Sequence, residues 1–133
     1  FATGNLLPPV ETAGRSWADG RQAGLWVAQD LAGRLPRQIP ALRLKVNDPR
    51  LKYAMPQCIG PNDAANGMKH IQMRVTERVS GTLVAGIHGK TIWTRPINTR
   101  PERRITASIA EIVSCANAHT GVVEFTIEGA QFA

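Results

Sequence analysis

The chain has 133 residues, of which 43% are hydrophobic, 20% are charged and only 5% are aromatic. This length is typical of one domain with one core, and these proportions indicate neither disorder nor a membrane-spanning chain. The net charge of +6 at pH 7 favours acidic partners such as nucleic acid, anionic lipid, anionic glycan or an acidic protein face. Because single-stranded nucleic acid is bound by stacking on aromatic rings, the low aromatic content favours a protein partner.

The beginning of the chain is expected to be an arm. Residues 1–15 contain two glycines and two prolines and show no apolar period, so we predict a flexible arm ahead of a single domain at residues 16–133. The chain starts at Phe1 rather than at a methionine, so we expect either a mature product, from which a signal peptide has been removed, or a piece of a longer protein.

A first helix is predicted over residues 17–34. Ser16 stands at the spacing of a helix cap, and apolar residues then recur every four positions through Ala23, Val27 and Leu31. Gly33 is expected to end the helix, since glycine is common just beyond a helix C-terminus.

Alternating apolar and polar residues predict strands over residues 42–46, 51–55 and 71–75, with a turn at 47–49 and a loop at 60–67. The dipeptides Ser80-Gly81 and His88-Gly89 are expected to bracket a further strand over 82–87, followed by one over 91–97. These segments predict an antiparallel meander.

A second helix is predicted after residue 104, because Ser108 and Glu111 have the spacing of a capping box and an apolar stripe follows. Gly121 is expected as its C-cap, and a last strand is expected over 123–127. The order of elements predicts an α+β fold, in which two helices pack on a mainly antiparallel sheet.

The two cysteines, Cys58 and Cys115, are 57 positions apart, and we expect one disulfide between them. Such a bond would place the protein in an oxidising compartment. The alternative is a pair of buried free thiols in a cytosolic protein.

No catalytic constellation can be read from the sequence. Cys115 and His119 are four residues apart on the second predicted helix, but a zinc site needs further ligands at a suitable spacing. His88 sits in what we interpret as a hairpin turn, and the carboxylates are scattered rather than paired. We therefore expect no enzyme, no cofactor and no metal, although a small enzyme remains one alternative.

The densest basic stretch suggests a partner-binding surface. It holds Arg95, Arg100, Arg103 and Arg104, whose guanidinium groups bind carboxylates or phosphates through paired hydrogen bonds. Trp93 precedes them and could anchor a partner, with a core position as the alternative.

The stretch from residue 24 to Cys58 runs helix, strand 42–46, then Asp48-Pro49-Arg50-Leu51. This order resembles the N-terminal part of the periplasmic chaperone of the flagellar P-ring, in which a helix, a strand and an Asp-Pro-Arg-Leu turn precede a disulfide cysteine. Trp93, in a later predicted strand, also resembles this family.

Residues 105–128, which include Ala118-His119-Thr120-Gly121, are similar to the helix, turn and strand of the small N-terminal domains of secretins and related secretion-system lipoproteins. Both resemblances imply a periplasmic or secreted, non-enzymatic protein-binding domain that acts as a chaperone or component of a flagellum, pilus or secretion system. The alternatives are a basic nucleic-acid-binding module and an unrecognised small enzyme.

Overall fold

The computed structural model describes residues 13–35, 42–116 and 121–131, which belong to two units. The first unit spans residues 1–38 and the second spans residues 39–133, and each is described by itself.

The described part of the first unit is a single helix, α1 (Ala13–Leu31). It begins earlier than predicted, so Ala13, Gly14 and Arg15 of the expected arm are helical, while residues 1–12 of that arm lie outside the described residues. The helix is followed by Gly33, whose positive φ of 66° is the backbone conformation that glycine adopts most easily. The predicted helix end is therefore confirmed to within a few residues.

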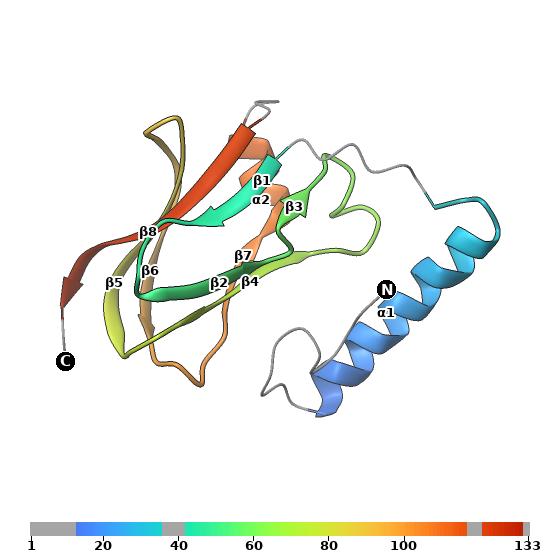
Figure 1. Cartoon of the computed structure of the whole chain (residues 1–133), viewed down its shortest axis with the longest axis horizontal. Coiled ribbons are helices and arrows are strands. Elements are labelled where there is room, and N and C mark those ends of the chain that lie inside the picture. Colours follow the sequence, from blue (N-terminus) through green and yellow to red (C-terminus); the bar gives the residue numbers. More distant parts are fainter. Residues whose placement is uncertain (1–12, 36–41, 117–120, 132–133) are drawn as a thin grey trace. The chain divides into compact units, whose positions relative to one another are not determined.

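The described part of the second unit contains two sheets and a short helix (Figure 1). Its elements are β1 (Leu42–Val46), β2 (Leu51–Met55), β3 (Cys58–Ile59), β4 (His70–Val75), β5 (Val79–Ile87), β6 (Lys90–Thr99), β7 (Ile105–Ser108), α2 (Ile109–Cys115) and β8 (Gly121–Gln131). The strands are hydrogen-bonded in the orders β3-β1-β8-β5-β6 and β2-β4-β7. All of these pairs are antiparallel except β1 with β8.

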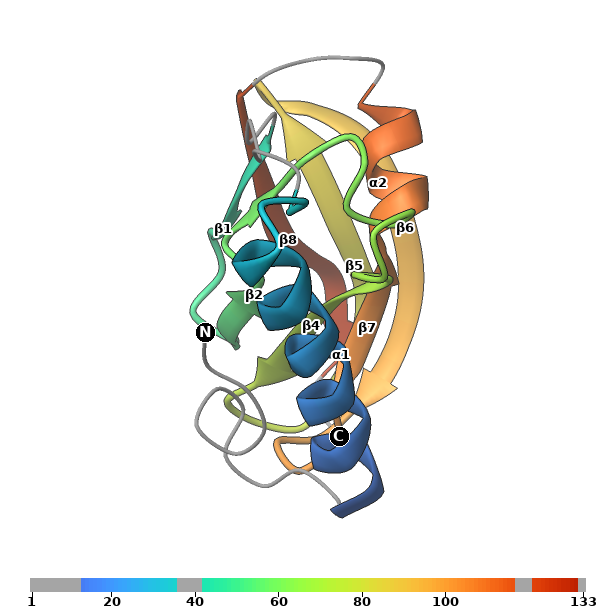
Figure 2. The same ribbon diagram turned by 90° about the vertical axis from the view of Figure 1, so that its right-hand side faces the viewer.

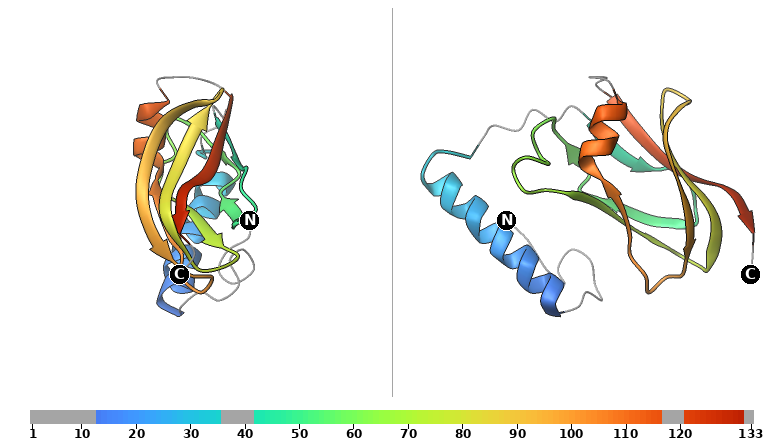
Figure 3. Two further views of the ribbon diagram at one scale, coloured as in Figure 1. Left: turned by 90° about the vertical axis from the view of Figure 1, so that its left-hand side faces the viewer. Right: turned by 180° about the vertical axis from the view of Figure 1, so that it is seen from behind.

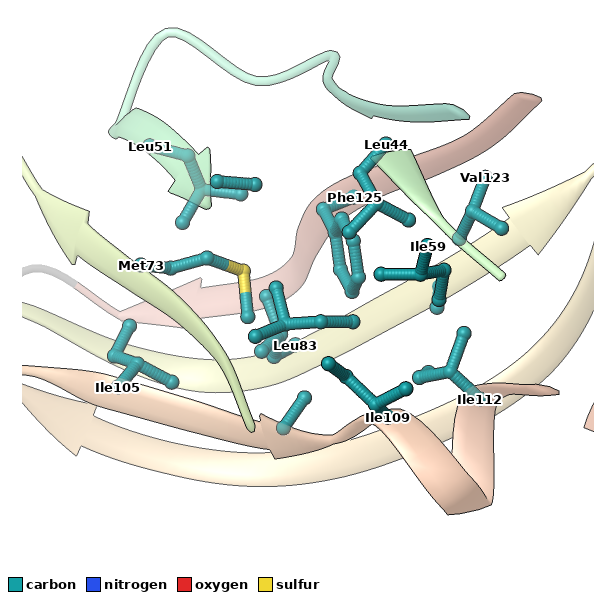
Figure 4. Close-up of a cluster of buried hydrophobic side chains, with 14 of the residues drawn as sticks. Leu44, Leu51, Ile59, Met73, Leu83, Ile105, Ile109, Ile112, Val123 and Phe125 are labelled. Carbon is teal, nitrogen blue, oxygen red and sulfur yellow. The ribbon is translucent and has the colours of Figure 1, made fainter. Parts of the chain in front are cut away.

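The core lies between the two sheets and α2. Figure 4 shows side chains from all three parts pointing into this space, among them Phe125 of β8, Met73 of β4 and Ile109 of α2, and each of these three is fully buried. Burying one such side chain stabilises a fold by roughly 1.5–3 kcal/mol. The alternation of apolar residues in the sequence thus does select the inward faces of the strands.

The predicted α+β class is confirmed, with two mostly antiparallel sheets where one was expected. Helix α2 packs on β6 and β7, as Figure 2 shows. Its predicted cap is present, since the Glu111 N–H donates to Ser108 Oγ at 3.3 Å. Gly121 opens β8 rather than capping α2, and residues 117–120 between them lie outside the described part of the chain.

One predicted turn is wrong. Ser80 and Gly81 lie inside β5, where they pair with Asn98 and Ile97 of β6. The pairing of β5 with β6 on one side and β8 on the other overrides the turn preference of a Ser-Gly dipeptide. The chain turns instead at residues 76–78, between β4 and β5.

The loop expected at residues 60–67 is present and is held from inside by one carboxylate. Asp63 is 3% exposed and accepts the Gly60 N–H at 2.7 Å. The main chain of Asp63 also contacts Gly60 and Met68, so this loop has a fixed shape.

Candidate functional site

Strand β6 forms one border of the five-stranded sheet, and it is the longest border strand in either sheet, with ten residues. The left panel of Figure 3 shows it along the margin of that sheet. Among the described strands only β5 pairs with it, so its other edge presents unpaired main-chain groups. Pro96, which cannot donate a main-chain hydrogen bond, fits a border position.

Two of the predicted partner-binding residues, Trp93 and Arg95, connect β6 to α2 and β7. They stand opposite Ala85 and Leu83 of β5, so they point to the core side of the sheet. The half-buried Trp93 donates its Nε1–H to Glu111 Oε2 of α2 at 3.0 Å. The Arg95 guanidinium donates to the carbonyl oxygen of Thr106 in β7. Both side chains therefore fix the position of the strand itself.

The other three predicted arginines lie in the connection from β6 to β7, residues 100–104, which we call the arginine turn. Arg100 Nε lies 3.4 Å from Glu102 Oε2, in a pair whose side chains are 60% and 70% exposed. Arg103 is exposed, and its N–H donates to the Arg100 carbonyl at 2.9 Å. Arg104 is half-buried and donates to Gln72 Oε1 of β4 at 3.4 Å. The structure thus brings Arg100 and Arg103 together at the surface and turns Arg104 inward.

Beneath the arginine turn lies Arg74 of β4, which the sequence places on a polar strand face. It is only 7% exposed, because the turn covers it. Its Nε donates to the Tyr53 hydroxyl at 3.1 Å, and its Nη1 donates to the carbonyls of Pro101 and Glu102 at 3.3 and 2.6 Å. Strand alternation gives no signal for such a residue, since it cannot show which loop folds over which face.

Arg78 lies at the same end of the sheet as the arginine turn. Arg78 immediately precedes Val79, which pairs with Thr99, the residue before Arg100. The strand register therefore sets Arg78 beside the arginine turn, although 22 positions of sequence separate Arg78 from Arg100.

A second charged turn joins β1 to β2. Asp48 accepts hydrogen bonds from Arg50 Nε at 2.8 Å, Arg50 Nη2 at 2.7 Å, the Arg50 main-chain N–H at 2.9 Å and the Ile127 N–H at 2.9 Å. The bonds from the Arg50 guanidinium, aided by the two main-chain donors, lower the pKa of Asp48 to about 2 against the opposing effect of burial. Arg50 in turn donates to the Ile127 carbonyl. This network ties the turn to β8.

A shallow, open hollow of about 460 Å³ lies on the outer side of the β5–β6 pair. Ser80, Thr82, Pro96, Asn98 and Gly129 are among its lining residues, and none of the lining residues has a titratable side chain. None of these lining residues can therefore act as a general acid or base.

The predicted disulfide is wrong. Cys58 and Cys115 are both free and exposed. Cys58 lies on β3 at one border of the five-stranded sheet, whereas Cys115 ends α2, which packs on β6 at the opposite border. The two thiols are therefore not bonded, which the spacing in the sequence does not reveal.

The remaining chemical candidates give no site. His88 and Gly89, with φ values of 51° and 76°, form the two-residue hairpin turn that the sequence predicts between β5 and β6. His119 lies outside the described residues. Within the described ranges no three His, Cys, Asp or Glu side chains gather as metal ligands, and no helix is long and apolar enough to cross a membrane.

No family model, no curated protein and no solved structure matches this chain.

Proposed function

We propose that this chain is a non-enzymatic protein-binding domain that pairs an extended segment of its partner with the outer edge of β6. The observation that carries the proposal is the ten-residue border strand with one unpaired edge. Adding a strand to such an edge supplies main-chain hydrogen bonds without a deep pocket, and side chains of alternate residues then supply specificity.

Strand β6 suits this role better than the other borders. β3 has two residues, β7 has four and β2 has five. At about 3.3 Å per residue, β6 offers roughly 33 Å of edge. Trp93 and Arg95 hold it to α2 and β7, so little order has to be gained when a partner strand arrives.

The proposed setting is the periplasm or the cell exterior, where the chain acts as a chaperone or component of a flagellum, pilus or secretion system. The support is the resemblance of the Asp48-Pro49-Arg50-Leu51 region to the P-ring chaperone and of residues 105–128 to small secretin domains. Chaperones of pilus subunits are known to act through strand addition.

The test selects binding peptides from a displayed random library and follows amide hydrogen exchange of the protein with a selected peptide. Because N–H groups alternate between the two edges of a strand, alternate residues of β6 should gain protection. The two-residue border β3 serves as internal control and should not change. A random DNA duplex over a salt series forms the second arm of the experiment. Protection that avoids β6, or tight DNA binding with a steep salt dependence, contradicts the proposal.

A further inference from the structure

We infer that the partner segment has an acidic N-terminal end, which the arginine turn binds while the rest of the segment pairs with β6. The inference rests on the proposed pairing at β6 and names the chemistry of the segment that fits there. It assigns Arg78, Arg100 and Arg103 as contacts of the partner and Arg74 as the residue that positions the arginine turn.

The arginine turn continues directly from the proposed binding edge. Strand β6 ends at Thr99 and the turn begins at Arg100. Antiparallel pairing is the arrangement of every strand pair but one in this unit, and it is slightly more stable per residue than parallel pairing. A segment that runs antiparallel to β6 places its N-terminal end beside the turn.

Two of the guanidinium groups there can accept a new partner. Arg103 is exposed, and among the described side chains Arg100 is engaged only by Glu102, in an exposed pair at 3.4 Å. Exposed pairs of this kind contribute little stability, so a carboxylate of the partner can replace Glu102 at small cost. Arg78, brought alongside by the pairing of Val79 with Thr99, adds a third positive charge.

The turn has a fixed shape because Arg74 holds it from below. Its buried guanidinium donates to two consecutive carbonyls, those of Pro101 and Glu102, while the Arg103 N–H closes the turn on Arg100. Guanidinium groups on a fixed main chain lose less freedom when they bind than those on a loose loop. Arg74 therefore acts on the partner through the turn and does not touch it.

An acidic peptide fits this surface better than a nucleic acid does. Glu77 precedes Arg78, and Glu102 lies between Arg100 and Arg103, so two acids alternate with the exposed arginines. The evenly spaced phosphates of a nucleic acid would meet these glutamates, whereas a peptide can place single carboxylates between them. Bases of a nucleic acid would also need an open aromatic ring on which to stack. The nearby ring of Tyr53 is half-buried, and its hydroxyl is engaged by Arg74.

The experiment compares three synthetic peptides that share one neutral, strand-forming sequence taken from the selection at β6. One is unmodified, one carries three glutamates at its N-terminus, and one carries them at its C-terminus. Binding to the full chain is measured by fluorescence anisotropy at low and high salt. The N-terminally acidic peptide should bind about fivefold more tightly than the other two, and added salt should remove this gain.

Variants of the protein then locate the effect. Arg100→Glu with Arg103→Glu should abolish the fivefold gain but leave binding of the neutral peptide unchanged. Arg43→Glu with Lys45→Glu makes the same charge change on β1, three strands away from β6, and should keep the gain. Arg74→Met leaves every exposed arginine in place and should reduce the gain, again without affecting the neutral peptide.

Three outcomes overturn the inference: equal affinity for all three peptides, an equal gain from C-terminal glutamates, or an equal loss from the β1 variant. In each case the neutral peptide can still protect β6 from hydrogen exchange, which leaves the proposed function standing. Failure of the neutral peptide to protect β6 contradicts the proposed function itself, so the two failures are distinguishable.

Discussion

Two turns of this protein each contain an acidic residue, a proline and an arginine, but their Arg–carboxylate pairs differ in geometry and burial. In one, Asp48 and Arg50 flank Pro49, and in the other, Arg100 and Glu102 flank Pro101. The first pair is bidentate at 2.7 and 2.8 Å with side chains 7% and 22% exposed. The second is a single contact at 3.4 Å with both side chains mostly in solvent.

The difference lies in what else each carboxylate meets. Asp48 also accepts two main-chain N–H groups, one of them from Ile127 of β8, which lies far away in the sequence. Glu102 contributes to its own turn through its main-chain carbonyl, which accepts a hydrogen bond from Arg74. An Arg–carboxylate pair therefore holds its turn in place where main-chain N–H groups also bind the carboxylate. Where they do not, the pair is an exchangeable surface contact.

The largest effect that follows from this comparison is at Asp48. The substitution Asp48→Ala leaves the half-buried Arg50 without its carboxylate partner and the Ile127 N–H without its acceptor, so the free energy of unfolding should fall by about 3 kcal/mol. Chemical denaturation measures this loss. Glu124→Ala is the control, because its partner Lys45 lies 3.9 Å away at the surface, and it should change stability by less than about 0.5 kcal/mol. A loss at Asp48 no larger than at Glu124 would remove the distinction between the turns.

Acid should weaken the first turn. The pKa of Asp48 falls from its ordinary value of 3.8 to about 2 in the folded chain. Its contribution to stability is therefore complete above about pH 4 and is lost as the pH falls toward 2, because the unfolded chain takes up the proton first. The loss attributable to Asp48 should be about 2 kcal/mol, measured as the difference between wild type and Asp48→Asn in denaturation at pH 5 and at pH 2. A parallel decline of both proteins would show that other carboxyl groups carry the acid sensitivity.

Sequence patterns predicted the elements of this fold better than their arrangement. The alternation of apolar residues located β1, β4 and β8, and the capping spacing located α2, because these signals depend on neighbours in the chain. The separation into two sheets and the parallel pairing of β1 with β8 depend on contacts between distant segments. The disulfide failed for the same reason, since spacing does not show where Cys58 of β3 and Cys115 of α2 lie in the fold.

The candidate site was predicted in part. Arg100 and Arg103 could be picked out because they are dense in the sequence, and the structure places both on one exposed turn. Arg74 could not, because it reads as an outward polar residue until the loop over it is known. Arg78 required the register of β5 with β6, which no local pattern contains.

The smallest expected effect is at Glu102, the carboxylate of the exposed pair. Glu102→Gln removes one charge from an exposed pair, while the main-chain carbonyl that accepts the Arg74 hydrogen bond remains in place. We therefore expect a change in unfolding free energy of less than about 0.5 kcal/mol, which should shrink further in high salt because exposed pairs are screened. Denaturation of wild type and variant at low and high salt provides the measurement, with Asp48→Asn treated identically for contrast. A loss of more than about 1 kcal/mol at Glu102 would mean that its side chain fastens the arginine turn as Asp48 fastens the other, and Arg100 would then not be open to exchange with a partner carboxylate.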